Sequence, residues 1–165
     1  MRHLPFVVLT VGLLTSQGIE GQSKRESIQG VWQTVEVTMT GPGARTITVL
    51  EPRPNLIIIT AKHYSRVEVH AEGPRSLPAD VTTASADELR SAWGPFVGEA
   101  GTYEVTNGTQ ITMRPIAAKN PAAMVPGAFS TYSYKLNGNT IVLTAQNTQN
   151  GSVVHPVTVR AVRVE

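Results

Sequence analysis

The sequence predicts an all-β protein, an antiparallel meander closed into a barrel of eight or nine strands, with one short helix in a long loop. From residue 28 onward, apolar and polar residues alternate with a period of two between turn residues, as is typical of antiparallel strands. Asn107-Gly108 and Asn137-Gly138 separate alternating segments, and Asn-Gly tolerates the positive φ of a tight hairpin turn. Because a long meander leaves two unpaired edges unless it closes on itself, we expect a barrel.

The individual strands are predicted from runs of alternating residues that are bounded by turn residues. Short connections join several consecutive runs, which indicates neighbours along the chain that pair with one another. We expect strands over residues 28–40, 45–50, 55–60, 63–70, 101–106, 110–117, 129–136, 140–147 and 156–164.

The segment TTASADELRSAWGPF breaks the alternation and predicts the one helix of the chain. Ser85 and, three residues later, Glu88 have the spacing of a capping box, in which each side chain bonds the other residue's backbone N–H. Gly94-Pro95 ends the helix, since proline cannot continue it.

The same helix carries Leu89 and Trp93 four residues apart, so they share a face that we expect to pack on the barrel. Two stretches rich in proline and glycine, 71–80 and 117–128, cannot be central strands. We expect them to form long loops at the barrel mouth, or flaps over it.

Composition restricts the classes of function. The 165 residues suffice for one domain, and charged residues make up 16% of the chain, below the roughly 25% of typical soluble domains. The net charge is +2, but lysine and arginine are scattered rather than clustered, so we expect no nucleic-acid partner. The absence of cysteine excludes disulfides, thiolate nucleophiles and cysteine-bound metals.

The N-terminus has the pattern of an export signal. Arg2 and His3 precede an apolar stretch of signal-peptide length, and small residues follow it. The stretch is too short for a transmembrane anchor, which needs about 20 apolar residues. We expect cleavage after Gly21, with Gly18 and a buried N-terminal strand or helix as alternatives, and hence a periplasmic or extracellular protein without stable membrane insertion. The chain then divides into a signal peptide (1–21), a short linker (22–27) and a barrel domain (28–165).

Gly30-Val31-Trp32, at the head of the first predicted strand, resembles the lipocalin signature. The phrases GVWQTVEV, HYSRVEVH, SADELRSAWGPF and FSTYSYKL extend the resemblance to bacterial lipocalin-like domain proteins over almost all of 28–165. The resemblance implies that Trp32 packs across the closed end of the barrel and that an arginine of the last strand, Arg160 or Arg163, lies over its ring. It also implies a calycin barrel of the lipocalin and fatty-acid-binding type. The chain departs from secreted animal lipocalins in lacking cysteine and in inserting a helix.

A barrel of this size is either filled with side chains or holds one small ligand. Tyrosine hydroxyls and arginine guanidinium groups inside a barrel form a site for a carboxylate. We therefore hypothesise that the interior binds a small hydrophobic or amphipathic molecule, with its acidic end at Arg66, Arg114, Tyr132 and Tyr134, and with Glu36 and Tyr64 as further candidates. The alternation leaves open which face of each strand points inward, and for any single arginine a solvent-facing position is the simpler interpretation.

Catalytic and metal-binding motifs were sought and not found. The histidines after the signal segment are His63, His70 and His155, and only His70 has a carboxylate, Glu68, on the same expected strand face. Two such ligands fall short of the usual three or four, and the sequence has neither a Gly-x-Ser-x-Gly elbow nor a glycine-rich phosphate loop. We expect no metal and no cofactor.

Two other functions remain open. A barrel-type isomerase or cyclase needs only one buried acid or base, and Glu36, His63, Tyr64 or Glu68 would serve. A structural or protein-interaction module of the cell envelope predicts a filled barrel and an exposed apolar patch. We expect a monomer whose main partner is a small molecule.

Overall fold

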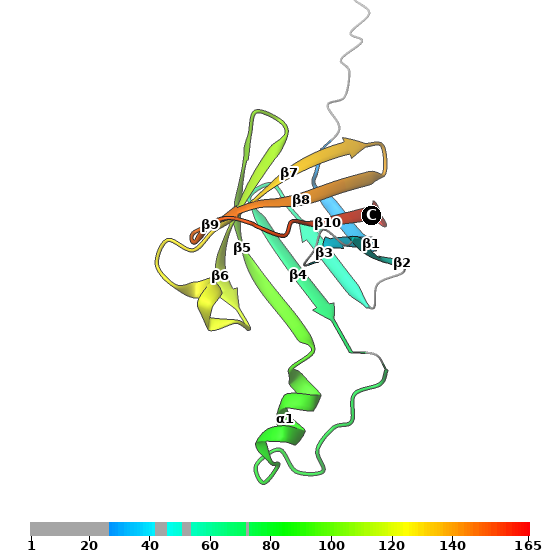
Figure 1. The fold of residues 1–165 in the computed structure, drawn as a ribbon, viewed down its shortest axis with the longest axis vertical. Helices are drawn as coiled ribbons and strands as arrows, with labels where there is room; N and C mark the ends of the chain where they lie inside the picture. Colours follow the sequence, from blue (N-terminus) through cyan, green and yellow to red (C-terminus); the bar gives the residue numbers. More distant parts are fainter. Residues whose placement is uncertain (1–26, 42–45, 51–53, 72) are drawn as a thin grey trace, which may run out of the picture.

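The computed structural model describes residues 27–41, 46–50, 54–71 and 73–165, which form one closed antiparallel β-barrel with a helix outside it (Figure 1). The predicted signal peptide and residues 22–26 of the predicted linker lie outside the described residues. The predicted fold class, an antiparallel barrel with one short helix in a long connection, is confirmed.

The barrel has eight strands in the order β10-β1-β3-β4-β5-β6-β7-β8, and β8 pairs with β10 to close the ring. Two extra strands extend it, because β2 pairs with β1 beyond the end of β3, and β9 pairs with β8. The strands are β1 (Gly30–Thr40), β2 (Thr46–Leu50), β3 (Asn55–Ile59), β4 (His63–Val69), β5 (Phe96–Thr106), β6 (Gln110–Ala118), β7 (Ser130–Asn137), β8 (Thr140–Thr148), β9 (Gly151–Ser152) and β10 (Val157–Arg163).

Tight turns gather at one end of the barrel, which we call the floor. Asn107 and Gly108 turn the chain between β5 and β6 with φ angles of 54° and 66°, as the Asn-Gly pair predicts. Asn137 instead remains in β7, and the β7–β8 turn is made by Gly138, with a φ of 56°, and Asn139. The second turn therefore lies one residue later than predicted.

The long connections lie at the opposite end, which we call the loop end. The helix α1 (Ala86–Trp93) follows β4 there, and the 3₁₀ helix η2 (Pro121–Met124) follows β6. The capping box is present: the Ser85 hydroxyl accepts from the backbone N–H of Glu88, and the Glu88 carboxylate accepts from that of Ser85. Most of the two proline- and glycine-rich segments thus lies in long connections at one end, as expected, but Ala117 and Ala118 belong to β6 and pair with β5.

The predicted packing of α1 on the barrel is wrong. Figure 1 shows the helix extending beyond the loop end, away from the strands, and Trp93 is 40% exposed. The helix is attached at its C-terminus instead, where Lys119 donates to the carbonyls of Trp93, Gly94 and Phe96. Arg75 donates to the carbonyl of Ala92 at 2.9 Å. Charge-assisted bonds to the last carbonyls hold this helix in place of apolar burial.

Strand β5 begins at Phe96, five residues before its predicted start. Two glycines in this stretch, Gly98 and Gly101, interrupt the alternation that marks a strand. Gly101 has a structural reason: it lies beside a register shift in the β5–β6 pairing, and a Cβ there would collide with the backbone carbonyl of Arg114. Gly101 therefore allows close approach of the two backbones, whereas a Cβ at Gly98 would meet the ring of Phe96.

The core fills the floor half of the barrel. Trp32 is fully buried, and its Nε1 donates to the carbonyl of Ile28 at 2.8 Å, so the indole satisfies its polar atom within the core. The other buried members are apolar or aromatic: Ile28, Ile57, Ile59, Tyr64, Ile111, Met113, Ile141, Leu143 and Ala161.

Candidate functional site

The inner face of β4 carries a row of polar side chains. Tyr64 is 2% exposed and belongs to the core, so Arg66 and Glu68, two and four residues later, face the interior as well. The alternate residues, among them Val67, face outward. Across the sheet, Arg66 pairs with Glu99 of β5, which places the Glu99 carboxylate on the same inner face.

These side chains contact one another in a chain. The Tyr64 hydroxyl donates to Oε1 of Glu99 at 3.0 Å, and Nη2 of Arg66 lies 3.2 Å from Oε2 of the same carboxylate. Nη1 of Arg66 lies 3.8 Å from Oε1 of Glu68, whose Oε2 lies 2.8 Å from Nε2 of His70. We call Tyr64, Arg66, Glu68, His70 and Glu99 the inner-wall cluster.

The surroundings raise the pKa of two residues of the cluster, Tyr64 and Arg66. Burial raises the pKa of Tyr64 well above its ordinary value, and the charge of Glu99 and the hydrogen bond to it raise it further. Burial alone would lower the pKa of Arg66, but the electrostatic effects of Tyr132, Glu99 and Glu68 outweigh it and the pKa is raised. Tyr64 is therefore a neutral phenol and Arg66 a fixed cation at neutral pH.

One polar atom of the cluster lacks a partner. Nε of Arg66 is buried and makes no hydrogen bond, although both terminal nitrogens of the guanidinium contact carboxylates. A buried donor without an acceptor costs about 1–3 kcal/mol, so such atoms are rare and need an explanation. This donor is enclosed by protein atoms, so the contacts of the two terminal nitrogens with Glu99 and Glu68 must offset the cost.

A cavity of about 280 Å³, lined in part by Arg66, lies at the loop end. Arg66 and Glu99 line it together with residues of β5 and β6 and of the connection that contains η2. The volume is at the lower end of the roughly 300–1,000 Å³ of ligand pockets. The remaining lining residues are Gly94, Phe96, Val97, Gly98, Ala118, Lys119, Asn120 and Ala123.

Tyrosines line the interior between the cluster and the floor. Tyr132 and Tyr134 of β7 and Tyr103 of β5 pack against the buried core. Burial raises the pKa of Tyr134, and burial followed by the proximity of Tyr134 raises that of Tyr103, whose hydroxyl donates to the Thr60 carbonyl at 2.7 Å. The interior thus has apolar walls with phenol hydroxyls rather than further charges.

Arg114 does not join the other predicted site residues. It follows the buried Met113 on β6 and so faces outward, where Nη1 lies 3.6 Å from Oε2 of Glu104. The four-residue convergence proposed from the sequence therefore reduces to Arg66, Tyr132 and Tyr134.

Glu36 is also on the outer face. Its Oε2 lies 2.8 Å from Nη2 of Arg160, and Arg160 faces away from the interior because its neighbour Ala161 is fully buried. The β1–β10 pairing shifts register between Thr34 and Glu36, so Thr34 is buried while Glu36 is not. Regular alternation from Trp32 would place the side chain of Glu36 inside the barrel. The register shift changes the face, so Glu36 lies outside.

The residues of the signature motif meet at the floor. The guanidinium carbon of Arg163 lies 4.2 Å from the ring centroid of Trp32, whereas Arg160 contacts Glu36. Gly30 has a φ of 142°, and a Cβ there would collide with the Arg163 guanidinium and lie 2.7 Å from the Glu165 carbonyl. The glycine is required because side chains rarely adopt this φ and because the Glu165 carbonyl belongs to the backbone and cannot move aside as the flexible arginine can.

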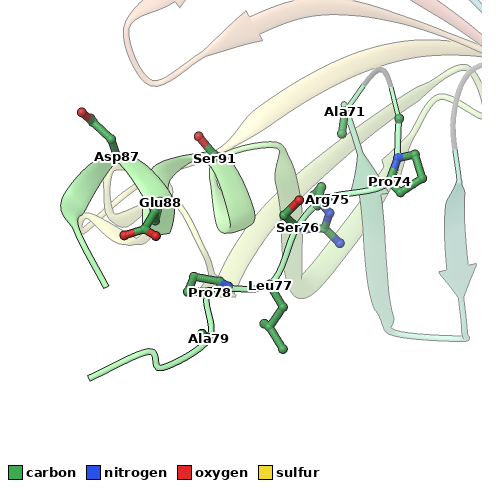
Figure 2. A pocket seen from close by; sticks show the side chains of 11 residues that line it. Ala71, Pro74, Arg75, Ser76, Leu77, Pro78, Ala79, Asp87, Glu88 and Ser91 are labelled. Carbon is green, nitrogen blue, oxygen red and sulfur yellow. The ribbon is translucent and has the colours of Figure 1, made fainter. Parts of the chain in front are cut away.

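A second hollow of about 570 Å³ lies between residues 71–79 and α1 (Figure 2). Its charged groups are already engaged: Glu88 in the helix cap, Asp87 with Arg90, and Arg75 with the carbonyl of Ala92. Figure 2 shows Leu77 pointing away from the helix, and this side chain is 75% exposed.

Sequence reasoning missed Glu99, the residue that links Tyr64 to Arg66. Its strand was not predicted there, and only the register of β5 against β4 reveals its position. Within the described part of the chain, no group of three histidine or acidic residues is placed to hold a metal ion. Among the described residues, no helix has the length and apolar character of a membrane span.

Comparisons with known proteins add little. No protein-family model and no curated protein matches the sequence. Among solved structures, the chain is similar to a redesigned β-barrel at 13% identity, with a TM-score of 0.37 over 83% of this chain and 91% of the other. The barrel architecture therefore rests on the strand pairings of the chain itself.

Proposed function

We propose that the barrel binds a small, mostly apolar molecule at its loop end, with the polar end of that molecule at the inner-wall cluster. The observation that carries the proposal is the cavity at the loop end, where the ion-paired Arg66 and Glu99 lie beside apolar residues. An apolar pocket with a few convergent polar groups is the usual form of a small-molecule site.

The surroundings of the cavity support this role. The cavity is lined by apolar side chains, among them Phe96, Val97 and Ala123, so an apolar group gains by leaving water there. The charged side chains of Arg66 and Glu99 hold each other in place on one wall. An apolar group against the apolar residues and a polar group at Arg66 would match this division.

We further infer that the barrel is of the lipocalin type. Support comes from Gly30, Trp32 and Arg163, which occupy the positions that the lipocalin resemblance implies for the glycine, the tryptophan and the arginine over its ring. The small-molecule role implied by that resemblance agrees with the role proposed from the cavity.

The isomerase or cyclase alternative is less well supported. Tyr64 has the strongly shifted pKa expected of a buried acid or base, but the shift is upward, away from neutral pH. A general base is most effective when its pKa lies near the working pH. Tyr64 suits the role of a permanently protonated donor to Glu99, and this favours binding over catalysis.

We also propose that the protein is exported, on the pattern of residues 1–21, which lie outside the described residues. The intact mass of the protein from culture medium or periplasm tests this. We expect the mass of a chain that begins at Gln22. A cytoplasmic protein that retains Met1 would contradict export.

Fluorescence titration with N-phenyl-1-naphthylamine, an uncharged apolar probe, tests the binding site. Ala118 lines the cavity, whereas its neighbour Ala117 does not and faces the opposite side of β6. Ala118→Phe should fill the cavity and weaken binding at least tenfold, and the matched control Ala117→Phe should bind like the parent. Absence of saturable binding in the parent, or equal loss in both variants, would refute the proposed site.

A further inference from the structure

We propose that the polar end of the bound molecule is an uncharged oxygen, such as an alcohol or ketone oxygen, rather than a carboxylate. This inference rests on the proposed binding function and specifies the chemistry of its ligand. It departs from the carboxylate site predicted from the sequence.

The charge of Arg66 is already balanced. Its two terminal nitrogens face the carboxylates of Glu99 and Glu68, at 3.2 and 3.8 Å. The cluster holds one guanidinium against two carboxylates, with the imidazole of His70 on the far side of Glu68. A ligand carboxylate would therefore lie beside two like charges, which disfavour it by direct repulsion.

The other cation near the cavity is engaged as well. The ammonium of Lys119 donates to the carbonyls of Gly94 and Phe96 at 2.9 and 2.7 Å, and to that of Trp93. These bonds hold the end of α1, so moving the ammonium to an anionic ligand would break them. Neither cation that lines the cavity is free to neutralise a carboxylate.

The hydrogen-bond capacity points the same way. The Tyr64 hydroxyl already donates its proton to Glu99, and Nε of Arg66 is enclosed by the protein. A carboxylate brings two oxygens and a full charge, and it needs several donors when it leaves water. An alcohol or ketone oxygen carries no full charge and needs fewer donors.

The test uses probes with one tail and different head groups: 1-decanol, 2-decanone, decanoate and decylamine. Each displaces N-phenyl-1-naphthylamine from the full mature protein at pH 7.5. We expect decanol and decanone to bind at least tenfold more tightly than decanoate, about 1.4 kcal/mol, and more tightly than decylamine. Tighter binding of decanoate or of decylamine would overturn the inference while leaving the binding function intact.

Two variants assign the discrimination to the cluster. Glu99→Gln removes one carboxylate beside Arg66, and we expect it to improve decanoate binding relative to decanol at least tenfold. Glu104→Gln removes the carboxylate paired with Arg114 on the outer face and should leave the ratio unchanged. An unchanged ratio in Glu99→Gln would overturn the inference. Failure of the parent to bind N-phenyl-1-naphthylamine at all would refute the binding function, and the head-group assignment with it.

Discussion

The guanidinium of Arg163 lies over the ring of Trp32, with its central carbon 4.2 Å from the ring centroid. The same guanidinium donates to the carbonyls of Ser27 and Gln29, so one side chain of the last strand holds the residues that precede the first strand. Backbone bonds add to this connection, since Val31 N–H donates to the Glu165 carbonyl at 3.0 Å. The floor of the barrel is thus built by both ends of the described chain.

Replacing Arg163 by alanine should destabilise the protein more than replacing Arg160. Arg163 contributes a cation–π contact, worth roughly 0.5–2 kcal/mol, and charge-assisted bonds to two carbonyls. Arg160 makes a part-exposed ion pair with Glu36, a class worth about 0–1 kcal/mol. Urea unfolding should give a loss above about 2 kcal/mol for Arg163→Ala and below about 1 kcal/mol for Arg160→Ala. Equal losses of unfolding free energy in the two variants would show that the contacts of Arg163 at the floor stabilise the protein no more than the Arg160–Glu36 ion pair does.

Gly30→Ala should destabilise the fold by about 2 kcal/mol or more, because a left-handed φ costs a side chain about 1–3 kcal/mol. The new methyl would also collide with the Arg163 guanidinium. Gly73→Ala is the matched control, since a Cβ there meets no atom within 4 Å. Thermal and urea unfolding of both variants provide the measurement. A Gly30→Ala protein as stable as Gly73→Ala would contradict the explanation of the motif.

Stability should fall above about pH 10, the ordinary pKa of tyrosine, in a way that depends on Tyr64. The unfolded chain releases this proton near that pH, while the folded protein retains it to higher pH because the pKa of Tyr64 is raised. Rising pH therefore favours the unfolded chain. Urea unfolding between pH 8 and 11 should show a smaller alkaline loss for Tyr64→Phe. Some loss should persist, because the pKa of Tyr103 and Tyr134 is also raised. Parallel curves for parent and variant would contradict the raised pKa.

Lys119→Met should release helix α1 without unfolding the barrel. The ammonium bonds three carbonyls at the helix end, and hydrogen bonds to charged groups contribute about 1.5–3 kcal/mol each. We expect amide exchange in α1, followed by mass spectrometry, to accelerate roughly tenfold or more, with little change in β1 or β10. Lys135→Met removes an exposed lysine of β7 as a control. If the Lys119→Met protein unfolded more slowly than the parent, or if its amide exchange in α1 were unchanged, the attachment of the helix by Lys119 would be contradicted.

The barrel could be predicted because the sequence signals for its strands and turns are local. Alternation marks the strands, Asn107-Gly108 marks a hairpin, and Ser85 with Glu88 marks the helix start, and each of these signals lies within a few residues. The helix position relative to the barrel could not be predicted the same way. Lys119, which anchors it, lies more than 20 residues from the carbonyls it contacts.

The site was only partly predictable, since it depends on which strand faces share the interior. Alternation within β4 groups Tyr64 with Arg66, but Glu99 joins them only through the register of β5. A register shift reverses the face expected for Glu36. Nothing in the sequence shows whether Arg114 follows the face of Arg66 or the opposite one.

The seam between β1 and β10 differs from the other seams among the described barrel strands, each of which joins consecutive strands of the chain or strands with one short strand between them. Local hairpins can form early at small entropic cost, whereas this seam must bring together segments more than a hundred residues apart. The Arg163 contacts therefore act at the step with the greatest loop-closure penalty. A variant in which the Arg163 contacts are weakened would keep its hairpins but lose the closed barrel. Retention of a ligand and completion of folding therefore depend on the same contacts.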